Sequence, residues 1–312
     1  MIEPKLVKVL NIVGSGRSGS TLVANIVGQI PGVFSAGEMH ALWQPGAIQQ
    51  ELCACGQPMT QCEIWQAIFT HAYGGLNKVD LNRVHHLYLH NARARYAIAN
   101  MLQMPRHDRS EQAEYLDYLE RLYLAIQGVT GCQVIIDTSK LPSYSYFLSL
   151  IPSLKSYSLH LVRDPRAVAY SWLRKKTWRT TQGNVEKTNS NIFQISREWN
   201  NQNVLAEFFG HNSQTKYMFM RYEDLVAEPE HRVREILDLV DLPDGISIVN
   251  GREVAVNTSH ILGANPNRFD RGTIRINLDD AWKTSMPVRN RLWIELLTLP
   301  LMVKYQYSAL HK

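Results

Sequence analysis

The stretch VLNIVGSGRSGSTLVANIV, residues 9–27, runs from an apolar segment through a glycine-rich turn into a segment of helical character. The turn nearly matches the Walker pattern of Gly, four residues, Gly, Lys and then Ser or Thr. Gly14 and Gly19 have that spacing and Thr21 fits the last position, but Ser20 stands at the lysine position. Because backbone N–H groups converge at such a turn and the helix dipole favours negative charge, the stretch predicts a strand, an anion-binding loop and a helix.

The composition is that of an ordinary globular protein. The 312 residues are 45% hydrophobic and 20% charged, and we expect a single domain over residues 1–312. The net charge of +5 suits an anionic ligand but not the dense basic face of a nucleic-acid-binding protein, so we expect no nucleic-acid partner. No segment is apolar over the length of a bilayer, and the N-terminal apolar run lacks a signal-peptide cleavage site. We therefore expect no membrane span and a cytoplasmic location.

Three further short apolar runs, each followed by polar residues, indicate more strands. They are Val134–Asp137, Ser158–Val162 and Lys216–Met220. Short buried strands that end in polar loops are typical of a parallel sheet covered by helices, with ligands bound at the carboxyl ends of the strands. We therefore predict an α/β fold with a central parallel sheet flanked by helices, similar to that of the P-loop nucleotide hydrolases.

Two segments depart from this pattern. Residues 66–130 have helical character and are rich in His, Tyr and Arg, and they separate the first strand from the second. We predict that they form a helical insertion or lid over the site. Residues 178–190, WRTTQGNVEKTNS, are polar and predict a loop.

The serine at the lysine position limits which kind of ligand the loop can bind. A Walker lysine reaches the β- and γ-phosphates, and the Ser or Thr after it binds Mg²⁺. Without that lysine, we expect a group of lower charge, such as a sulfuryl donor. Backbone N–H groups and side chains of the loop would hold it: Arg17, Ser18, Gly19, Ser20 and Thr21. The alternative is a tight turn before a capped helix, with no ligand.

The loop, taken with LHLVRDPRAVAYSW at residues 159–172, resembles the sulfotransferases that use 3′-phosphoadenosine 5′-phosphosulfate (PAPS). In that family the first loop holds the 5′-phosphosulfate, while an arginine at a strand end and a serine in the next helix hold the 3′-phosphate. Arg163 and Ser171 match those two positions. Asp164 suits the N-cap of that helix and Pro165 its first position. A surface salt bridge for Arg163 and an ordinary helix hydroxyl for Ser171 are the alternatives.

Sulfuryl transfer requires that an acceptor hydroxyl or amine lose its proton in line with the leaving phosphate. Glu38 and His40, in FSAGEMHALW, are the candidate bases. The segment GEMHAL resembles the heparan-type sulfotransferases, which implies that Glu38 is the base, with His40 as the second candidate. The same resemblance implies that Lys140, in IIDTSK, stabilises the bridging oxygen of the leaving group. The alternatives are a solvated carboxylate beside a packing histidine, and a surface lysine.

The resemblance extends to two further parts of the donor site. It implies that Tyr222, in RYEDL, lies near the adenine, although a tyrosine at a strand end is equally a core residue. The segment NPNRFDRG, residues 265–272, is similar to the family's late arginine–glycine phosphate clamp, but its spacing to Trp282 is longer. Arg268, Arg271 or neither then contacts the 3′-phosphate, and we favour Arg271.

Three cysteines lie close together in CACGQPMTQCEIW, at Cys53, Cys55 and Cys62. With His40 nearby they could in principle bind zinc. However, C-x-C lacks the usual gap of two to four residues, and the fourth cysteine of the chain is distant. We therefore expect buried thiols or a Cys55–Cys62 bridge, and no metal.

The sequence thus predicts an enzyme, a PAPS-dependent sulfotransferase that acts on a hydroxyl or amine of a small-molecule or glycan acceptor. Two alternatives remain open. One is a small-molecule kinase of the related fold, which would need magnesium and for which Asp137 is the candidate ligand. The other is a non-catalytic protein that binds anionic glycans or nucleotides. The identity of the acceptor and the oligomeric state are left open.

Overall fold

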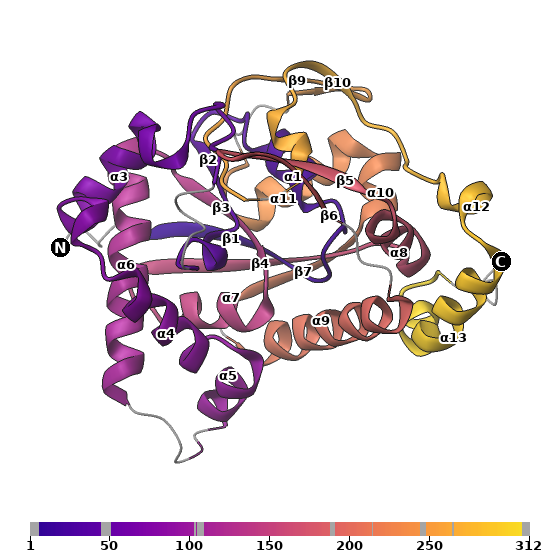
Figure 1. Ribbon diagram of the computed structural model, residues 1–312, viewed down its shortest axis with the longest axis horizontal. Helices are drawn as coiled ribbons and strands as arrows, with labels where there is room; N and C mark the ends of the chain where they lie inside the picture. The colour runs from indigo at the N-terminus through magenta and orange to yellow at the C-terminus, as the bar shows by residue number, and fades with distance from the viewer. Residues whose placement is uncertain are drawn as a thin grey trace.

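Five parallel strands form the central sheet, in the order β2-β3-β1-β4-β7 (Figure 1). The computed structural model describes residues 6–44, 51–102, 104, 109–187, 191–213, 215–243, 248–263 and 265–307. The predicted α/β fold with a central parallel sheet is confirmed. The strands are β1 (Val7–Val13), β2 (Val33–Gly37), β3 (Val134–Lys140), β4 (Leu154–Val162) and β7 (Lys216–Arg221).

Helices cover both faces of this sheet, and for this reason the strands are apolar on both sides. On β1, Leu10 and Ile12 pack into a core with α1 and α11, whereas Val9 packs into a second core on the opposite face. Figure 1 shows α1, α10 and α11 above the sheet and α7 and α9 below it. The bounds of these helices are α1 (Ser20–Val27), α7 (Pro142–Ser149), α9 (Ile192–Asn212), α10 (Tyr222–Ala227) and α11 (Pro229–Leu239).

Of the described elements, four α-helices lie between β2 and β3 and form an insertion there. Its last and longest helix packs against β1 and β3, and two of the others pack against that helix. The insertion therefore covers part of one face of the sheet. It consists of α3 (Glu63–Tyr73), α4 (Leu81–Asn91), α5 (Ala94–Met101) and α6 (Arg109–Thr130).

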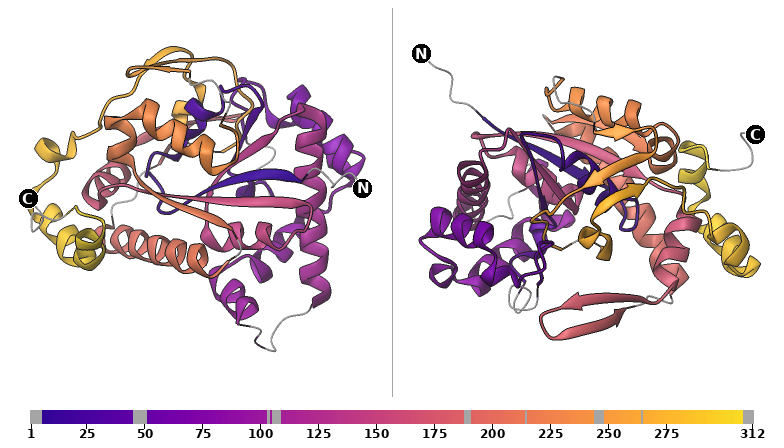
Figure 2. Two further views of the ribbon diagram at one scale, coloured as in Figure 1. Left: turned by 180° about the vertical axis from the view of Figure 1, so that it is seen from behind. Right: turned by 90° about the horizontal axis from the view of Figure 1, so that it is seen from above.

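The prediction of a loop over residues 178–190 is wrong for its described part. β5 (Lys176–Thr180) pairs with β6 (Gly183–Lys187) in an antiparallel hairpin that projects from the body of the molecule (Figure 2, right). Gly183 has a φ of 110°, which only glycine adopts readily, and it closes the tight turn. Among the described residues of the hairpin, the one apolar cross-strand pair is Trp178 and Val185, and the other residues of KTWRT and GNVEK are polar or glycine, so the apolar alternation that marks a strand is weak. Residues 188–190 lie outside the described residues.

The remaining elements lie after β4 and after α11. These elements are α8 (Pro165–Leu173), β8 (Val249–Asn250), β9 (Glu253–Val256), β10 (Gly272–Arg275), α12 (Trp282–Ser285) and α13 (Val288–Lys304). A small antiparallel sheet has the strand order β10-β9-β8.

Within the described ranges, no helix combines the length and apolar character needed to cross a bilayer.

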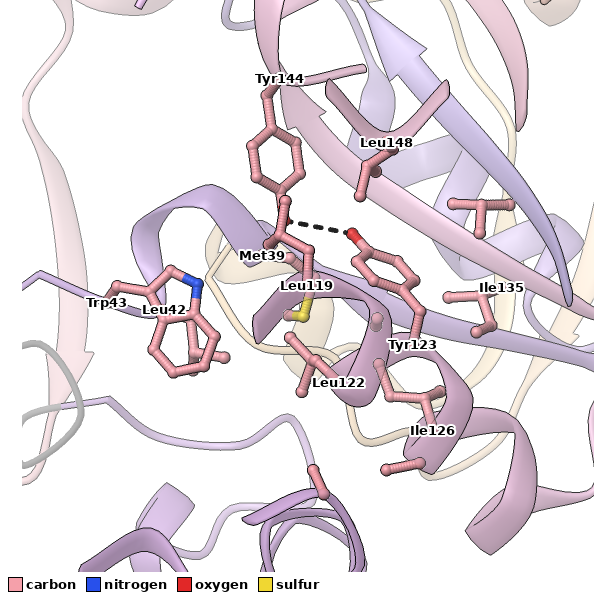
Figure 3. Close-up of a cluster of buried hydrophobic side chains, with 14 of the residues drawn as sticks. Met39, Leu42, Trp43, Leu119, Leu122, Tyr123, Ile126, Ile135, Tyr144 and Leu148 are labelled. Carbon is pink, nitrogen blue, oxygen red and sulfur yellow. Dashed lines mark hydrogen bonds between the residues drawn. The ribbon is translucent and has the colours of Figure 1, made fainter. Parts of the chain in front are cut away.

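A pair of buried tyrosines joins the insertion to the sheet. Tyr123 of α6 and Tyr144 of α7 lie among apolar side chains with their hydroxyl oxygens 3.3 Å apart (Figure 3). The Tyr123 hydroxyl also donates to the carboxylate of Asp137 on β3. Burial raises the pKa of Asp137 to about 6, although hydrogen bonds from Ser139 and Tyr123 oppose the shift. Asp137 is thus a buried carboxyl group that depends on its tyrosine donor.

Tyr123→Phe is expected to lower the free energy of unfolding by about 1–3 kcal/mol, because it removes the donor to Oδ2 of the buried Asp137 and leaves only the Ser139 N–H, which donates to Oδ1. Tyr115→Phe is a matched control in the same core. Its hydroxyl is also buried and has no hydrogen-bond partner in the described part of the chain, so its removal should change stability little. Urea unfolding of both variants measures the difference, and equal losses would contradict the role of the Tyr123 hydroxyl.

Candidate active site at the carboxyl edge of the sheet

The parallel arrangement brings the residues that follow each strand to one edge of the sheet. Glu38 follows β2, Lys140 ends β3, the glycine loop 14–19 follows β1, Arg163 follows β4 and Tyr222 follows β7. The strand order therefore places the loop between Lys140 on one side and Arg163 on the other. Segments that are far apart in the sequence meet here because parallel strands all end at the same edge.

The glycine loop is tightly packed against its neighbours. Gly14 and Gly19 have φ values of 125° and 102°, which are strained for any other residue. A Cβ atom on Gly19 would lie 2.4 Å from the ring of Tyr222, and one on Gly14 would lie 2.8 Å from the carbonyl oxygen of Leu161. Both glycines are therefore required by the close approach of the loop to β4 and to Tyr222, the residue that follows β7.

Two cavities lie on either side of the loop. The first has a volume of about 290 Å³, and the second half of the loop contributes Arg17 and Gly19 to it. The second has a volume of about 280 Å³, and the first half of the loop contributes Gly14 and Gly16. The loop therefore forms part of the wall of both cavities.

The predicted site residues separate between these two cavities according to their expected roles. Six of those predicted to hold the donor line the first cavity: Arg17, Gly19, Thr21, Arg163, Ser171 and Tyr222. All three predicted catalytic residues line the second: Glu38, His40 and Lys140. Residues predicted from separate motifs thus meet in two neighbouring chambers.

Arg17 is a buried cation in the wall of the first cavity. Its guanidinium lies 4.4 Å from the ring centre of Trp172 and 5.2 Å from that of Trp178. Its Nε and Nη1 atoms are buried, and neither has a hydrogen-bond partner among the described residues. Burial lowers the pKa of Arg17 to about 10, against the opposing effect of Glu38, so the group stays charged at neutral pH. A buried positive charge with unused donors is suited to binding an anion.

Arg163 is held in place by neighbouring groups. Its Nη2 donates to the carbonyl oxygen of Asp279 at 2.8 Å and lies 3.3 Å from the Asp279 carboxylate. Its guanidinium also stacks over the ring of Tyr222 at 4.6 Å. Asp164 does not pair with Arg163. It accepts from the backbone N–H of Arg166 at 2.8 Å, which confirms the predicted N-cap of α8.

Glu38 and Lys140 form an ion pair in the second cavity. Lys140 Nζ donates to the Glu38 carboxylate and to the carbonyl oxygen of Thr138, the latter at 2.9 Å. Lys140 has a φ of 64°, so its backbone is in a strained conformation of the kind found at functional sites. Burial acts to raise the pKa of Glu38, but the charge and hydrogen bond of Lys140, together with the charge of Arg268, outweigh it and lower the pKa below its ordinary value.

His40 is neutral at this site near pH 7. Burial lowers its pKa to about 4, although Glu38 opposes the shift. Its backbone N–H donates to the Ser139 hydroxyl at 3.1 Å, while its Nδ1 is buried without a hydrogen-bond partner in the described ranges. At neutral pH the second cavity therefore contains two groups able to accept a proton, the Glu38 carboxylate and the His40 imidazole.

Three predicted donor residues do not line the first cavity. Ser18 in the loop and Ser20 at the start of α1 are both buried. Arg271 donates to the carbonyl oxygens of Arg268 and Asp270, at 3.1 and 2.6 Å, and to that of Ala54. Arg275, three residues beyond Gly272, is the late arginine that lines this cavity.

Sequence reasoning missed several lining residues on both sides. Asn265 and Asp279 line the first cavity, and α9 contributes Gln194 and Glu198 to the second. The segment 265–272 could be connected with the site from the sequence, because it is similar to a phosphate clamp. For α9 the sequence offered no such indication, because its polar face resembles that of any surface helix. No described residue of the helical insertion lines either cavity, and its role as a lid stays a prediction.

The predicted Cys55–Cys62 bridge is wrong, since both thiols are free. Cys53 and Cys62 are buried, as expected for the alternative. The histidine near these thiols is His260, whose Nδ1 lies 3.2 Å from Cys62 Sγ. His40 instead lines the second cavity beside Glu38.

Arg17→Met is expected to raise the free energy of unfolding of the ligand-free protein by about 1 kcal/mol or more, because it replaces a buried cation that has unused donors with an apolar side chain. The matched control is Arg163→Met, which should lower stability because it removes the bonds to Asp279. Urea unfolding in a buffer free of sulfate and phosphate measures both. A loss of stability in Arg17→Met as large as that in Arg163→Met would contradict this description of Arg17.

The solved structures that are similar to this chain include three sulfotransferases or sulfotransferase domains. The sulfotransferase domain from the Synechococcus PCC 7002 olefin synthase is 19% identical, with 96% of each chain covered and a TM-score of 0.49. The sulfotransferase domain from the curacin biosynthetic pathway is 19% identical, with 94% of this chain and 97% of that chain covered and a TM-score of 0.47. A sulfotransferase from Alicyclobacillus acidocaldarius is 13% identical, with 96% of each chain covered and a TM-score of 0.38.

A comparison with curated proteins found no match. The sequence model described as "Sulfotransferase family" matches residues 10–245, which include the glycine loop, Glu38, Lys140 and the Arg163–Ser171 segment. Since this match covers most of the chain, the protein belongs to the sulfotransferase family.

Proposed function

We propose that this sulfotransferase takes its sulfuryl group from PAPS and transfers it in line to a hydroxyl or amine of a small-molecule or glycan acceptor. The observation that carries the proposal is the pair of cavities on either side of the glycine loop. One holds the buried cations Arg17 and Arg163, and the other holds the Glu38–Lys140 ion pair. A donor chamber and an acceptor chamber that meet at an anion-binding loop are what a transfer between two substrates requires.

In this proposal the donor occupies the first cavity. The loop backbone, Arg17 and Thr21 hold the 5′-phosphosulfate, since an anion there takes up the unused donors of Arg17. Arg163 and Ser171 hold the 3′-phosphate, and the ring of Tyr222 lies beside the adenine. Arg275 replaces Arg271 as the late arginine, because it lines the cavity while Arg271 is bonded to three backbone carbonyls.

The transfer step uses the residues of the second cavity. The acceptor oxygen or nitrogen forms a bond to sulfur while the bond from sulfur to the bridging oxygen of the 5′-phosphate breaks. Glu38 accepts the proton of the acceptor, and Lys140 stabilises the charge that develops on the bridging oxygen. When the donor draws Lys140 away from Glu38, burial raises the pKa of the carboxylate, which makes Glu38 a stronger base. His40 remains the second candidate base.

The two alternatives have less support. A kinase would need magnesium ligands, but Asp137 accepts from the Tyr123 hydroxyl and from the Ser139 N–H and lines neither cavity. A non-catalytic anion-binding protein would have no use for the strained Lys140 paired with Glu38 at the mouth of a second chamber.

Calorimetric titration tests the donor assignment. The spent donor, 3′-phosphoadenosine 5′-phosphate, should bind in magnesium-free buffer, while ATP should not gain affinity when magnesium is added. Arg163→Ala and Arg275→Ala should each weaken binding by about 10-fold or more, because each removes a charged bond to phosphate. Arg271→Ala is the matched control and should leave affinity unchanged. A preference for ATP that depends on magnesium would overturn the proposal in favour of a kinase.

The pH dependence of turnover tests the base. Glu38→Gln should lower kcat by about 100-fold or more and leave the affinity for the spent donor unchanged. In the wild-type protein kcat/KM reports the free enzyme, in which Lys140 pairs with Glu38, so the lowered pKa of Glu38 should preserve kcat/KM as the pH falls from 8 to about 5. Lys140→Ala removes the charge that lowers the pKa of Glu38. In this variant we expect a lower kcat, and we expect the fall in rate on the acid side of the pH profile to begin at a higher pH.

Turnover is followed as release of 3′-phosphoadenosine 5′-phosphate from PAPS, with a phenol, an aliphatic alcohol and an amino sugar as acceptor probes. His40→Asn is the companion variant. If it abolishes turnover while Glu38→Gln retains it, His40 is the base and the assignment to Glu38 is wrong.

A further inference from the structure

A cluster of three cysteines and one histidine lies outside both cavities. The ligand atoms of Cys53, Cys55, Cys62 and His260 all lie within 4.8 Å of one another. His260 Nδ1 lies 3.2 Å from Cys62 Sγ and 3.6 Å from Cys53 Sγ. None of the four residues lines the donor or the acceptor cavity, so the cluster is not part of the transfer site.

We propose that these four residues bind one zinc ion in a closed, structural site. Three thiolates and one imidazole are a common ligand set for structural zinc. Zinc at its usual bond lengths holds such ligand atoms about 3.6–3.8 Å apart in a tetrahedron, close to the spacing of this cluster. Soft sulfur ligands exclude magnesium and calcium, which prefer oxygen. With four protein ligands, no coordination position is open for a substrate.

The backbone holds the ligands in place without the ion. Gly56 N–H donates to the Cys53 carbonyl at 2.8 Å, which closes a tight turn around Cys55. The Trp65 indole donates to the His260 carbonyl at 2.8 Å. Ala54 N–H donates to the Ile261 carbonyl at 3.0 Å, and this bond joins the cysteine loop to the histidine segment. Such preorganisation lowers the entropic cost of assembling a four-ligand site.

The ion would link two segments that support the active site. Its cysteines come from residues 53–62, and its histidine lies two residues before Leu262. The Leu262 carbonyl accepts from the backbone N–H of Glu38 at 2.9 Å. Zinc at this position would therefore stabilise the segment against which Glu38 is placed. On binding, Zn²⁺ replaces the protons of the three thiols, which pass to solvent, and no residue is oxidised or reduced.

Metal analysis of the purified protein tests this proposal, which does not depend on the identity of the sulfuryl donor. The protein is prepared without chelators, incubated with ZnCl₂ and dialysed, and its zinc content is measured by mass spectrometry. We expect one zinc per chain. Cys53→Ser, Cys62→Ser and His260→Ala should each lose most of it. Cys132→Ser is the matched control, because Cys132 is buried and free but is not a member of the cluster, and it should keep its zinc.

A second measurement, made on the wild-type protein, tests the proposal even if the variants fail to fold. In the wild-type protein, replacement of zinc by Co²⁺ should produce the intense visible bands of a tetrahedral cobalt–thiolate site, and modification of the thiols by a mercurial should release the metal in proportion. Absence of zinc from the wild-type protein after incubation would overturn the proposal. So would a non-reducing peptide map that shows Cys55 joined to Cys62 in the protein as purified.

Discussion

The close approach of the glycine loop to the strands on either side is the constraint on which the rest of the site depends. Gly19 contacts the ring of Tyr222, and Gly14 contacts the backbone of β4 and bonds to the Lys140 carbonyl at 3.2 Å. The loop can therefore lie in only one position relative to Arg163 and Lys140. Since the loop divides the two cavities, its position also determines where a donor and an acceptor could meet.

The charged groups at the carboxyl edge of the sheet lower the stability of the ligand-free protein. Arg17 is buried with unused donors, and Lys140 holds a strained backbone conformation. The Glu38 carboxylate is stabilised as an anion chiefly by Lys140, which the proposed reaction needs for the leaving group. Arg17 is left incompletely satisfied in the ligand-free protein. In the proposed reaction, binding of an anionic donor would satisfy Arg17 and would free Glu38 to act as a base.

The segment 260–271 shows how a late part of the chain supports an early one. Leu262 bonds to Ala36 and Glu38 through its backbone, Asn265 bonds to Thr21, and Arg271 bonds to Ala54. The fragment NPNRFDRG indicated that this region matters, but a sequence motif does not show which side chain turns toward the cavity. The structure turns Arg271 to backbone carbonyls and leaves Arg275 on the cavity wall.

The sequence by itself determined the strand–loop–helix at residues 9–27, the parallel sheet and the N-cap of α8, because local spacing and apolar runs specify these features. It also pointed to Glu38, Lys140, Arg163 and Ser171 through short motifs. Only the tertiary structure decided that these residues divide between two cavities and that His260 joins cysteines about 200 residues earlier in the chain. The physical reason is that such contacts depend on strand order and on long-range packing, which no local pattern records.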